Sequence, residues 1–195
     1  VEDDHNVVKP PRPALGWTSD SAALLLSDGW DIWKVPTSGG AAVNLTGNGR
    51  KDAIRYRSIA RLDPEEEGID LSKTRYVSAF AEWTKKGGYA ALEPGKPGAQ
   101  MLLWDDAAFG LNKARKADVY FYTKSTYKDP ADAYVTDATL KAGRKLTSAD
   151  EQVKAFTWSA GQMLVEYTFT LNKAKGPQKL QGSLSGVCWL RAWRS

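Results

Sequence analysis

Seven carboxylates carry the acid–base chemistry that this sequence offers. Glycoside hydrolysis uses two carboxyl groups placed about 5 to 10 Å apart across a sugar, one of them kept protonated by its surroundings. The chain also has eight tryptophans, whose rings can stack on sugars. A carboxylate-dependent hydrolase acting on a glycoside or an ester is therefore one hypothesis for this protein. The candidate residues are Glu65, Glu66, Glu67, Glu82, Asp105, Asp106 and Glu166.

Local structure offers a second explanation for most of these residues. Asp63 suits a helix N-cap, Pro64 suits the first helical position, and Gly68 suits a helix end. The three glutamates between them would complement the dipole of a helix N-terminus, so we predict one short helical turn near 63–68. Asp105 and Asp106 fit a turn after a strand. Large rings fill the space between packed sheets, which would account for tryptophans such as Trp17, Trp33 and Trp158.

A Ser-His-Asp triad is not expected in this chain. The triad needs a base to accept the serine proton, and His5, in a polar N-terminal stretch, is the sole histidine. The sequence Gly-Ser-Leu-Ser-Gly at 182–186 places Leu184 where a nucleophile elbow has its serine. With Cys188 as the sole cysteine, neither an internal disulfide nor a Cys/His zinc site is predicted. We expect no metal and no cofactor.

Composition and charge are those of a soluble globular protein. Hydrophobic residues make up 42% and charged residues 26% of the chain, and the formal net charge is +4. No stretch is long and apolar enough for a membrane span, and the first six residues lack the features of a signal peptide. We therefore expect no membrane association, and either the cytoplasm or the periplasm or exterior fits.

The densest basic group of the chain lies at residues 50–61. A nucleic-acid groove would combine such charges with stacking aromatic rings on one face. No recognised nucleic-acid-binding motif accompanies the group, so a solvated strand and turn is the favoured interpretation and no nucleic-acid partner is predicted. The residues are Arg50, Lys51, Arg55, Arg57 and Arg61.

The elements that would position these side chains are short strands. Residues 22–26 form an apolar run, an Asp-Gly turn follows at 28–29, and 31–35 and 41–46 read as two further strands joined by Gly39-Gly40. This pattern predicts a three-stranded antiparallel meander, which is most of one four-stranded propeller blade.

Parts of this stretch recur along the chain. Trp17 with the apolar run at 24–26 returns as Trp158 with 163–165, 141 positions later (158 minus 17). Asp31-Ile32-Trp33 returns as Asp118-Val119-Tyr120, and Asn44-Leu45-Thr46 as Lys145-Leu146-Thr147. Blades of about 40 to 50 residues fit these offsets. The sequence therefore predicts an all-β fold, a partial β-propeller of about four blades of antiparallel meanders.

Three regions follow from this pattern. Residues 1–16, rich in proline, read as an extended segment, 17–185 as the propeller-type domain, and 186–195 as an atypical tail. Two hairpins are predicted within the domain, 76–83 with 89–92 and 156–159 with 163–170. Further strands are expected around 54–58 and at 101–104, 118–123, 133–137 and 180–184.

Several short motifs resemble the β-propeller of bacterial serine peptidases of the prolyl oligopeptidase family. They run in order from about Lys9 to Ser185 and so cover most of the chain. They are Lys9-Pro10-Pro11-Arg12-Pro13, Gly16-Trp17-Thr18, Trp30-Asp31-Ile32-Trp33, Asn44-Leu45-Thr46, Ser78-Ala79-Phe80 with Thr84-Lys85, and Val165-Glu166-Tyr167-Thr168.

The resemblance implies a non-catalytic role. In that family a propeller of about seven or eight blades caps an α/β-hydrolase domain and filters peptides by size. It implies peptide substrates and a hydrolase domain that is absent from this chain, and the tail at 186–195 is unlike the family. Paired glutamates hold a peptide's amino terminus in some related dipeptidyl peptidases, which makes Glu65 and Glu66 candidates for substrate binding. Exposed blade edges would favour self-association. A peptide- or carbohydrate-binding module is a further alternative to the hydrolase hypothesis above.

Overall fold

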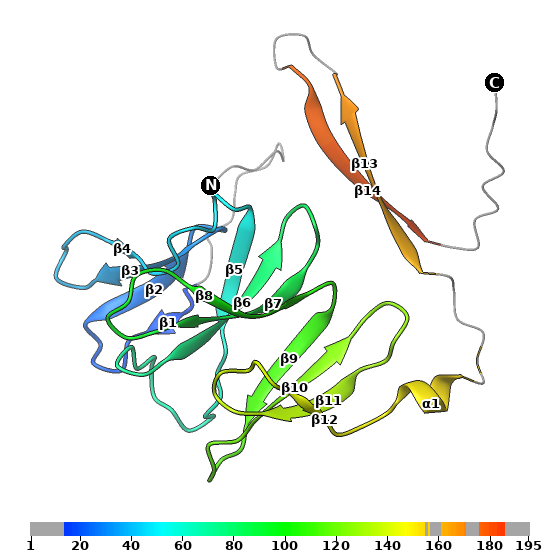
Figure 1. Ribbon diagram of the computed structural model, residues 1–195. Helices are drawn as coiled ribbons and strands as arrows, with labels where there is room; N and C mark the ends of the chain where they lie inside the picture. The colour runs from blue at the N-terminus through cyan, green and yellow to red at the C-terminus, as the bar shows by residue number, and fades with distance from the viewer. Residues whose placement is uncertain (1–13, 155, 157–160, 171–175, 186–195) are drawn as a thin grey trace.

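The chain forms antiparallel β-sheets with almost no helix. The computed structural model describes residues 14–154, 156, 161–170 and 176–185, and within them lie fourteen strands and one helix of four residues, α1 (Asp150–Val153) (Figure 1). The described part of the chain has no helix with the length and apolar character needed to cross a bilayer. The all-β prediction is confirmed.

Three of the four sheets are four-stranded meanders in chain order. The first sheet contains β1 (Gly16–Trp17), β2 (Ala23–Ser27), β3 (Ile32–Pro36) and β4 (Val43–Asn44). The second contains β5 (Ile54–Ile59), β6 (Arg75–Ala81), β7 (Gly87–Leu92) and β8 (Gln100–Asp105). The third contains β9 (Ala108–Lys113), β10 (Tyr120–Ser125), β11 (Asp132–Thr136) and β12 (Arg144–Lys145). The fourth sheet is a hairpin of β13 (Gln162–Phe169) and β14 (Gln178–Ser185).

The second sheet packs between the other two meanders. Successive side chains on a strand point to opposite faces, so Val77 of β6 joins one core and its neighbour Tyr76 joins the other. The first core combines Ile32 of the first sheet with Tyr56, Val77, Ala79, Ala90 and Leu92 of the second. The second core combines Tyr76 and Leu103 with Leu111, Tyr120 and Tyr122 of the third sheet and with Leu140.

A buried aspartate joins the third and fourth strands of the first sheet. The hydroxyl of Thr46 donates to Asp31 Oδ1 over 2.5 Å, and the buried amide of Gly49 donates to the same oxygen over 2.9 Å. The amide of Ile32 in turn donates to the Thr46 hydroxyl over 3.1 Å. We call this arrangement the Asp31–Thr46 pair.

The third sheet repeats the arrangement 101 positions later (132 minus 31). Thr147 donates to Asp132 Oδ1 over 2.7 Å, the amide of Ala149 donates to the same oxygen over 2.8 Å, and the amide of Ala133 donates to the Thr147 hydroxyl over 2.9 Å. The predicted match of the Leu-Thr sequences is therefore confirmed. The match of Asp31 with Asp118 is wrong, because Asp118 precedes the second strand of its sheet, β10, whereas Asp31 and Asp132 both lie at the third strand.

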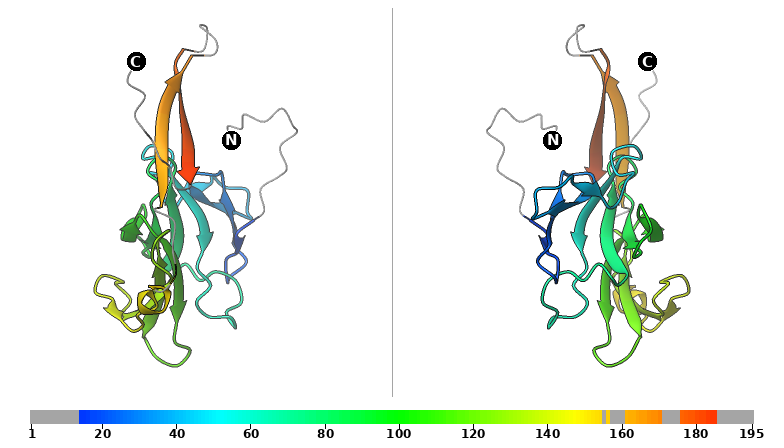
Figure 2. Two further views of the ribbon diagram at one scale, coloured as in Figure 1. Left: turned by 90° about the vertical axis from the view of Figure 1, so that its right-hand side faces the viewer. Right: turned by 90° about the vertical axis from the view of Figure 1, so that its left-hand side faces the viewer.

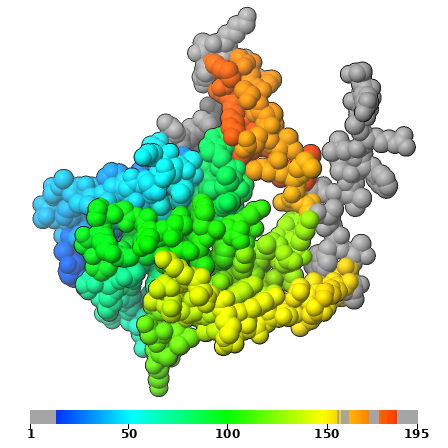
Figure 3. All heavy atoms as spheres, viewed as in Figure 1, coloured from blue at the N-terminus to red at the C-terminus, as the bar shows by residue number. Residues whose placement is uncertain are grey.

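The hairpin β13–β14 projects beyond the three stacked sheets (Figures 2 and 3). Its described attachments to the second sheet include Gln181, which donates to the carbonyl of Trp83 over 2.7 Å, and Lys179, which lies 4.8 Å from the centre of the Trp83 ring. The strand register places mainly apolar residues on one face of the hairpin, together with Gly182 and, at one end, Gln178 opposite Phe169. Five apolar side chains of this face are between 39% and 58% exposed. The apolar side chains of that face are Met163, Val165, Tyr167, Phe169, Leu180 and Leu184.

Two predicted local structures are wrong. Residues 63–68 form a turn at Pro64–Glu65 and not a helical turn, although Asp63 does accept a hydrogen bond from the Glu65 amide. Gly68 has a positive φ of 75°, and Ile69 then exchanges backbone hydrogen bonds with Trp17 and Ser19 of the first sheet, which holds the segment extended. The second wrong prediction is the hairpin of 156–159 with 163–170. The strand at 163–170 pairs with β14 instead, and Phe156 lies outside any strand. Residues 157–160 lie outside the described residues.

Two further differences concern packing and the number of sheets. Trp17 does not fill a core, since it is 53% exposed on the outer face of the first sheet. The described residues contain three four-stranded sheets and a hairpin, where about four blades are predicted. Strand β9 was not predicted. The segments 1–13, with His5, and 186–195, with Cys188, lie outside the described residues, and so does Trp158.

Candidate functional site

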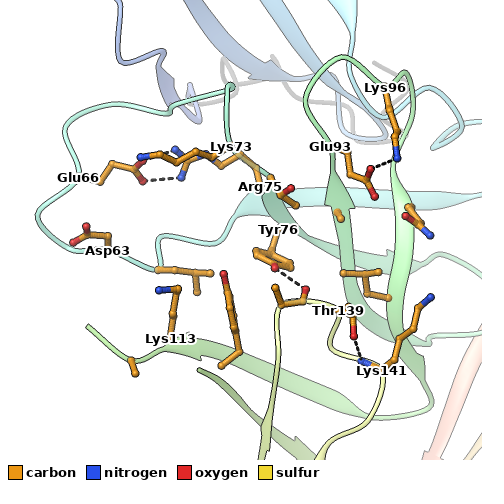
Figure 4. Close-up of a pocket in the computed structure, with 18 of the residues that line it drawn as sticks. Asp63, Glu66, Lys73, Arg75, Tyr76, Glu93, Lys96, Lys113, Thr139 and Lys141 are labelled. Carbon is orange, nitrogen blue, oxygen red and sulfur yellow. Dashed lines mark hydrogen bonds and ion pairs between the residues drawn. The ribbon is translucent and has the colours of Figure 1, made fainter. Parts of the chain in front are cut away.

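A pocket of about 750 Å³ lies between the second and third sheets, at the end where β6 begins and β9 ends (Figure 4). Its walls come from the loop after β5, the start of β6, the β7–β8 connection, the end of β9 and the loop after β11. Six cations and three acids line it, a formal charge of +3 (six minus three). The cations are Lys73, Arg75, Lys96, Lys113, Arg115 and Lys141, and the acids are Asp63, Glu66 and Glu93.

Arg75 and Glu66 form a fixed, largely shielded ion pair in this wall. The two guanidinium amino groups of Arg75 donate to the two carboxylate oxygens of Glu66, one of them over 2.7 Å, and its Nε donates to the carbonyl of Asp70 over 2.7 Å. The two side chains are 11% and 19% exposed. Bidentate, partly buried pairs of this kind hold their geometry better than single surface contacts. Arg75 therefore acts as part of the pocket frame.

Two tyrosines form the inner part of the pocket. Tyr76 donates its hydroxyl to the carbonyl of Ala138 over 2.7 Å, which joins the second and third sheets. Its ring lies 5.5 Å from the ring of Tyr120. Burial, and next the hydrogen bond with Tyr120, raises the pKa of the Tyr76 hydroxyl above its usual value. The Tyr76 hydroxyl is therefore neutral at neutral pH, and the rings of both tyrosines line the pocket.

The remaining cations are in exchangeable or weak contacts. Lys73 reaches Asp70 over 3.1 Å, and Lys113 reaches Asp118 over 3.7 Å. Lys96 pairs with Glu93 while its own side chain is 71% exposed. Lys141 is exposed and has no ion-pair partner among the residues that the structure describes. Exposed pairs contribute about 0–1 kcal/mol each, so an anionic ligand can replace these partners at low cost.

Glu66 lines this pocket and Glu65 precedes it in the chain, but both carboxylates have partners. Glu66 is held by Arg75, and Glu65 pairs with Arg115 at the surface. A peptide ammonium would have to displace a guanidinium from each of them. Glu67 is exposed on the same loop.

Of the other predicted carboxylates, Glu82, Asp105 and Asp106 lie at the opposite end of the second sheet, and Glu166 lies in β13 of the hairpin. Glu82 follows the last residue of β6, Ala81, whereas Arg75 of the pocket begins that strand. Six steps of about 3.3 Å separate the two ends by roughly 20 Å. A catalytic pair of Glu66 with Glu82 would therefore exceed the spacing that glycoside hydrolysis requires.

Three of these carboxylates are paired with cations, and the pKa of each is lowered. The Arg55 guanidinium lowers the pKa of Glu82, Lys124 lowers that of Asp105, and Lys179 lowers that of Glu166, each chiefly through a direct hydrogen bond. Asp106 is exposed beside Asp105. A general acid needs a raised pKa, and no described carboxyl group with a resolved shift has one.

The basic group at residues 50–61 is engaged with aromatic rings and acids of the same chain. Arg55 lies 4.3 Å from the centre of the Trp30 ring, and Arg57 lies 4.1 Å from that of Phe80. Arg61 donates to the carbonyl of Glu66 over 3.0 Å. These contacts give structural roles to three of the five cations.

The pocket cations carry no signal in the local sequence. Each stands in a short loop or at a strand end, and no local motif unites them. The signal comes from the topology of the sheet. In an antiparallel meander the start of β6, the end of β7 and the start of β8 lie at the same end of the sheet. Charged residues at alternate strand ends would have suggested a common site. Across the described ranges, no group of three His, Cys, Asp or Glu residues is placed to hold a metal ion.

Comparison with known proteins identifies no family for the chain. No protein-family model matches it, and no curated protein matches it significantly.

Proposed function

We propose that the three four-stranded sheets are consecutive blades of a β-propeller, and that the chain is the non-catalytic, substrate-gating part of a serine peptidase of the prolyl-oligopeptidase type. The observation that carries the proposal is the repeated aspartate–threonine arrangement. Asp31 with Thr46 and Asp132 with Thr147 make the same contacts at the same strand positions of two sheets. Repeated contacts in sheets that pack face to face are typical of blades.

The motifs shared with the peptidase family supply the functional half of the proposal. A propeller acts by steric selection, since a narrow passage admits flexible peptides and rejects folded proteins. The covalent chemistry would belong to an α/β-hydrolase partner. The sequence itself has a single histidine, His5, and no nucleophile elbow.

Turnover measurements test this role. The purified chain is assayed against prolyl-peptide, acyl-ester and glycoside substrates, with and without a serine-directed fluorophosphonate. We expect no turnover and no covalent labelling. Turnover that resists the inhibitor and disappears with Glu→Gln variants of the predicted carboxylates would instead support the stand-alone hydrolase.

A binding module without a peptidase partner is the second candidate, and the cationic pocket favours it. Its volume lies in the range of small-molecule and peptide sites. Under this alternative the chain binds its ligand by itself and associates with no hydrolase. Co-purification with a hydrolase domain, or its absence, distinguishes the two candidates.

We also propose self-association of the chain through its apolar surfaces. A two-stranded hairpin is marginal in water by itself, and five half-exposed side chains on its apolar face present roughly 400–500 Å². The outer face of the first sheet is a second apolar surface, formed by Trp17, Leu24, Leu26, Trp33 and Val35. If the hairpin of each copy covers the first sheet of the other, the twofold contact buries roughly 1,600–2,000 Å², as much as a stable dimer needs.

A further inference from the structure

The pocket between the second and third sheets has charges that are spread around its rim. Lys73 stands before β6, Lys96 between β7 and β8, Lys113 at the end of β9, and Lys141 after β11. Neighbouring strands are about 4.8 Å apart and packed sheets about 10 Å apart. These cations therefore surround a space too wide for one compact anion to reach all of them.

The interior of the pocket suits an organic ligand. Between the cations lie the rings of Tyr76 and Tyr120 and the side chains of Leu62 and Leu102. A volume of about 750 Å³ holds a ligand of several residues. A suitable ligand has a partly apolar body and negative charges spaced along it.

An extended peptide with acidic side chains has this distribution of charge. Side chains on one face of an extended chain recur every second residue, about 7 Å apart. Their carboxylates can reach cations on both sheets, and they compete with partners such as Asp70 and Glu93, whose lysines Lys73 and Lys96 are 70% and 71% exposed. The pair of Arg75 and Glu66 stays in place as the frame.

We propose that this pocket is a binding site for short acidic peptides. The inference rests on the proposed function, since it names the class of peptide that the gating domain would favour. Lys141 is the residue that tests it best. Its side chain is exposed and has no ion pair among the described residues, so its replacement removes a ligand contact without breaking an internal one.

The test measures binding of capped five-residue peptides by fluorescence anisotropy. The acidic probe is Glu-Ala-Glu-Ala-Glu, and the matched neutral probe is Gln-Ala-Gln-Ala-Gln. We expect the acidic peptide to bind at least about tenfold more tightly at low salt, and the difference to shrink as salt screens the charges. Lys141→Glu should weaken acidic-peptide binding about tenfold, since it replaces one attraction by one repulsion.

A matched control separates a local contact from the effect of net charge. Lys51 is exposed in the loop before β5, at the far end of the second sheet, so Lys51→Glu makes the same charge change away from the pocket. We expect Lys51→Glu to change the affinity less than twofold. Equal effects of the two variants, or equal binding of the acidic and neutral peptides, would overturn the proposal.

Two further probes make the outcome specific. Inorganic pyrophosphate that binds more tightly than the acidic peptide would reassign the pocket to compact phosphates and overturn the peptide class. A neutral prolyl peptide tests the gating role by itself. If the prolyl peptide binds and the acidic and neutral five-residue peptides bind equally well, the inference about charge fails and the proposed function stands. If no peptide binds, both fail.

Discussion

The Asp31–Thr46 pair is expected to contribute a large share of the stability of the first sheet. Asp31 is 5% and Thr46 1% exposed, and the Asp31 carboxylate accepts one hydrogen bond from the Thr46 hydroxyl and one from the Gly49 amide. Hydrogen bonds to charged groups contribute about 1.5–3 kcal/mol each. We therefore predict that Asp31→Ala lowers the free energy of unfolding by about 3–5 kcal/mol.

Thr46→Val keeps the shape of the side chain and removes its hydroxyl. The Ile32 amide then loses its acceptor, which lies 3.1 Å away, and Asp31 loses a donor. We expect a loss of about 2–3 kcal/mol. Thr46→Ser retains both hydrogen bonds and removes one buried methyl group, so it should cost only about 1 kcal/mol.

Urea denaturation followed by circular dichroism measures these changes. The double variant of Asp31→Ala and Thr46→Val should lose about 1–2 kcal/mol less than the sum of the single variants, because the two groups contact each other. Asp52→Ala is the control, since its exposed carboxylate accepts a single described hydrogen bond, from Asn48. The reasoning is refuted if Asp31→Ala and Thr46→Val each cost less than about 0.5 kcal/mol, or no more than the control.

Three further predictions concern other parts of the fold. Gly88→Ala would place a methyl group against the backbone carbonyl of Leu103 in β8, so urea denaturation should show a loss of at least about 2 kcal/mol. Burial raises the pKa of Tyr56 to about 12. The stability that its neutral side chain contributes is therefore complete below pH 10 and is lost as the pH rises from 10 to 12. Tyr56→Phe should flatten the profile of stability against pH over that interval. Light scattering should show a dimer that Tyr167→Asp or Phe169→Asp converts to a monomer; a wild-type monomer would contradict the proposed contact.

Sequence patterns were sufficient for most strands of the three meanders. Period-two alternation identified β6 and turn residues separated it from β7, because these signals are local. The segment Ala108–Lys113 was missed: Asp105-Asp106 reads as a turn and Gly110 interrupts the apolar pattern. In the structure Gly110 pairs with Thr123 of β10, whose hydroxyl would lie 2.8 Å from an added Cβ. A close approach of this kind depends on the neighbouring strand and cannot be seen in the segment itself.

The candidate site was predicted less well than the fold. Carboxylates are candidates for acid–base chemistry by residue type alone, yet Glu66 and Glu82 are ion-paired at opposite ends of one sheet. The pocket depends on contacts between strands far apart in the chain, such as the hydrogen bond from Tyr76 to Ala138, 62 residues away. Such long-range neighbours follow from sheet packing and have no local sequence signal.

Binding of intact, flexible peptides is the measurement that tests the account most directly. One labelled peptide is titrated into the purified chain in two forms, free and embedded in the interior of a small folded protein, and the free peptide is then recovered and weighed by mass spectrometry. The account predicts that the free peptide binds, that the folded form does not, and that the recovered peptide is intact. Equal binding of both forms, or recovery of cleaved peptide, would contradict a non-catalytic gating domain.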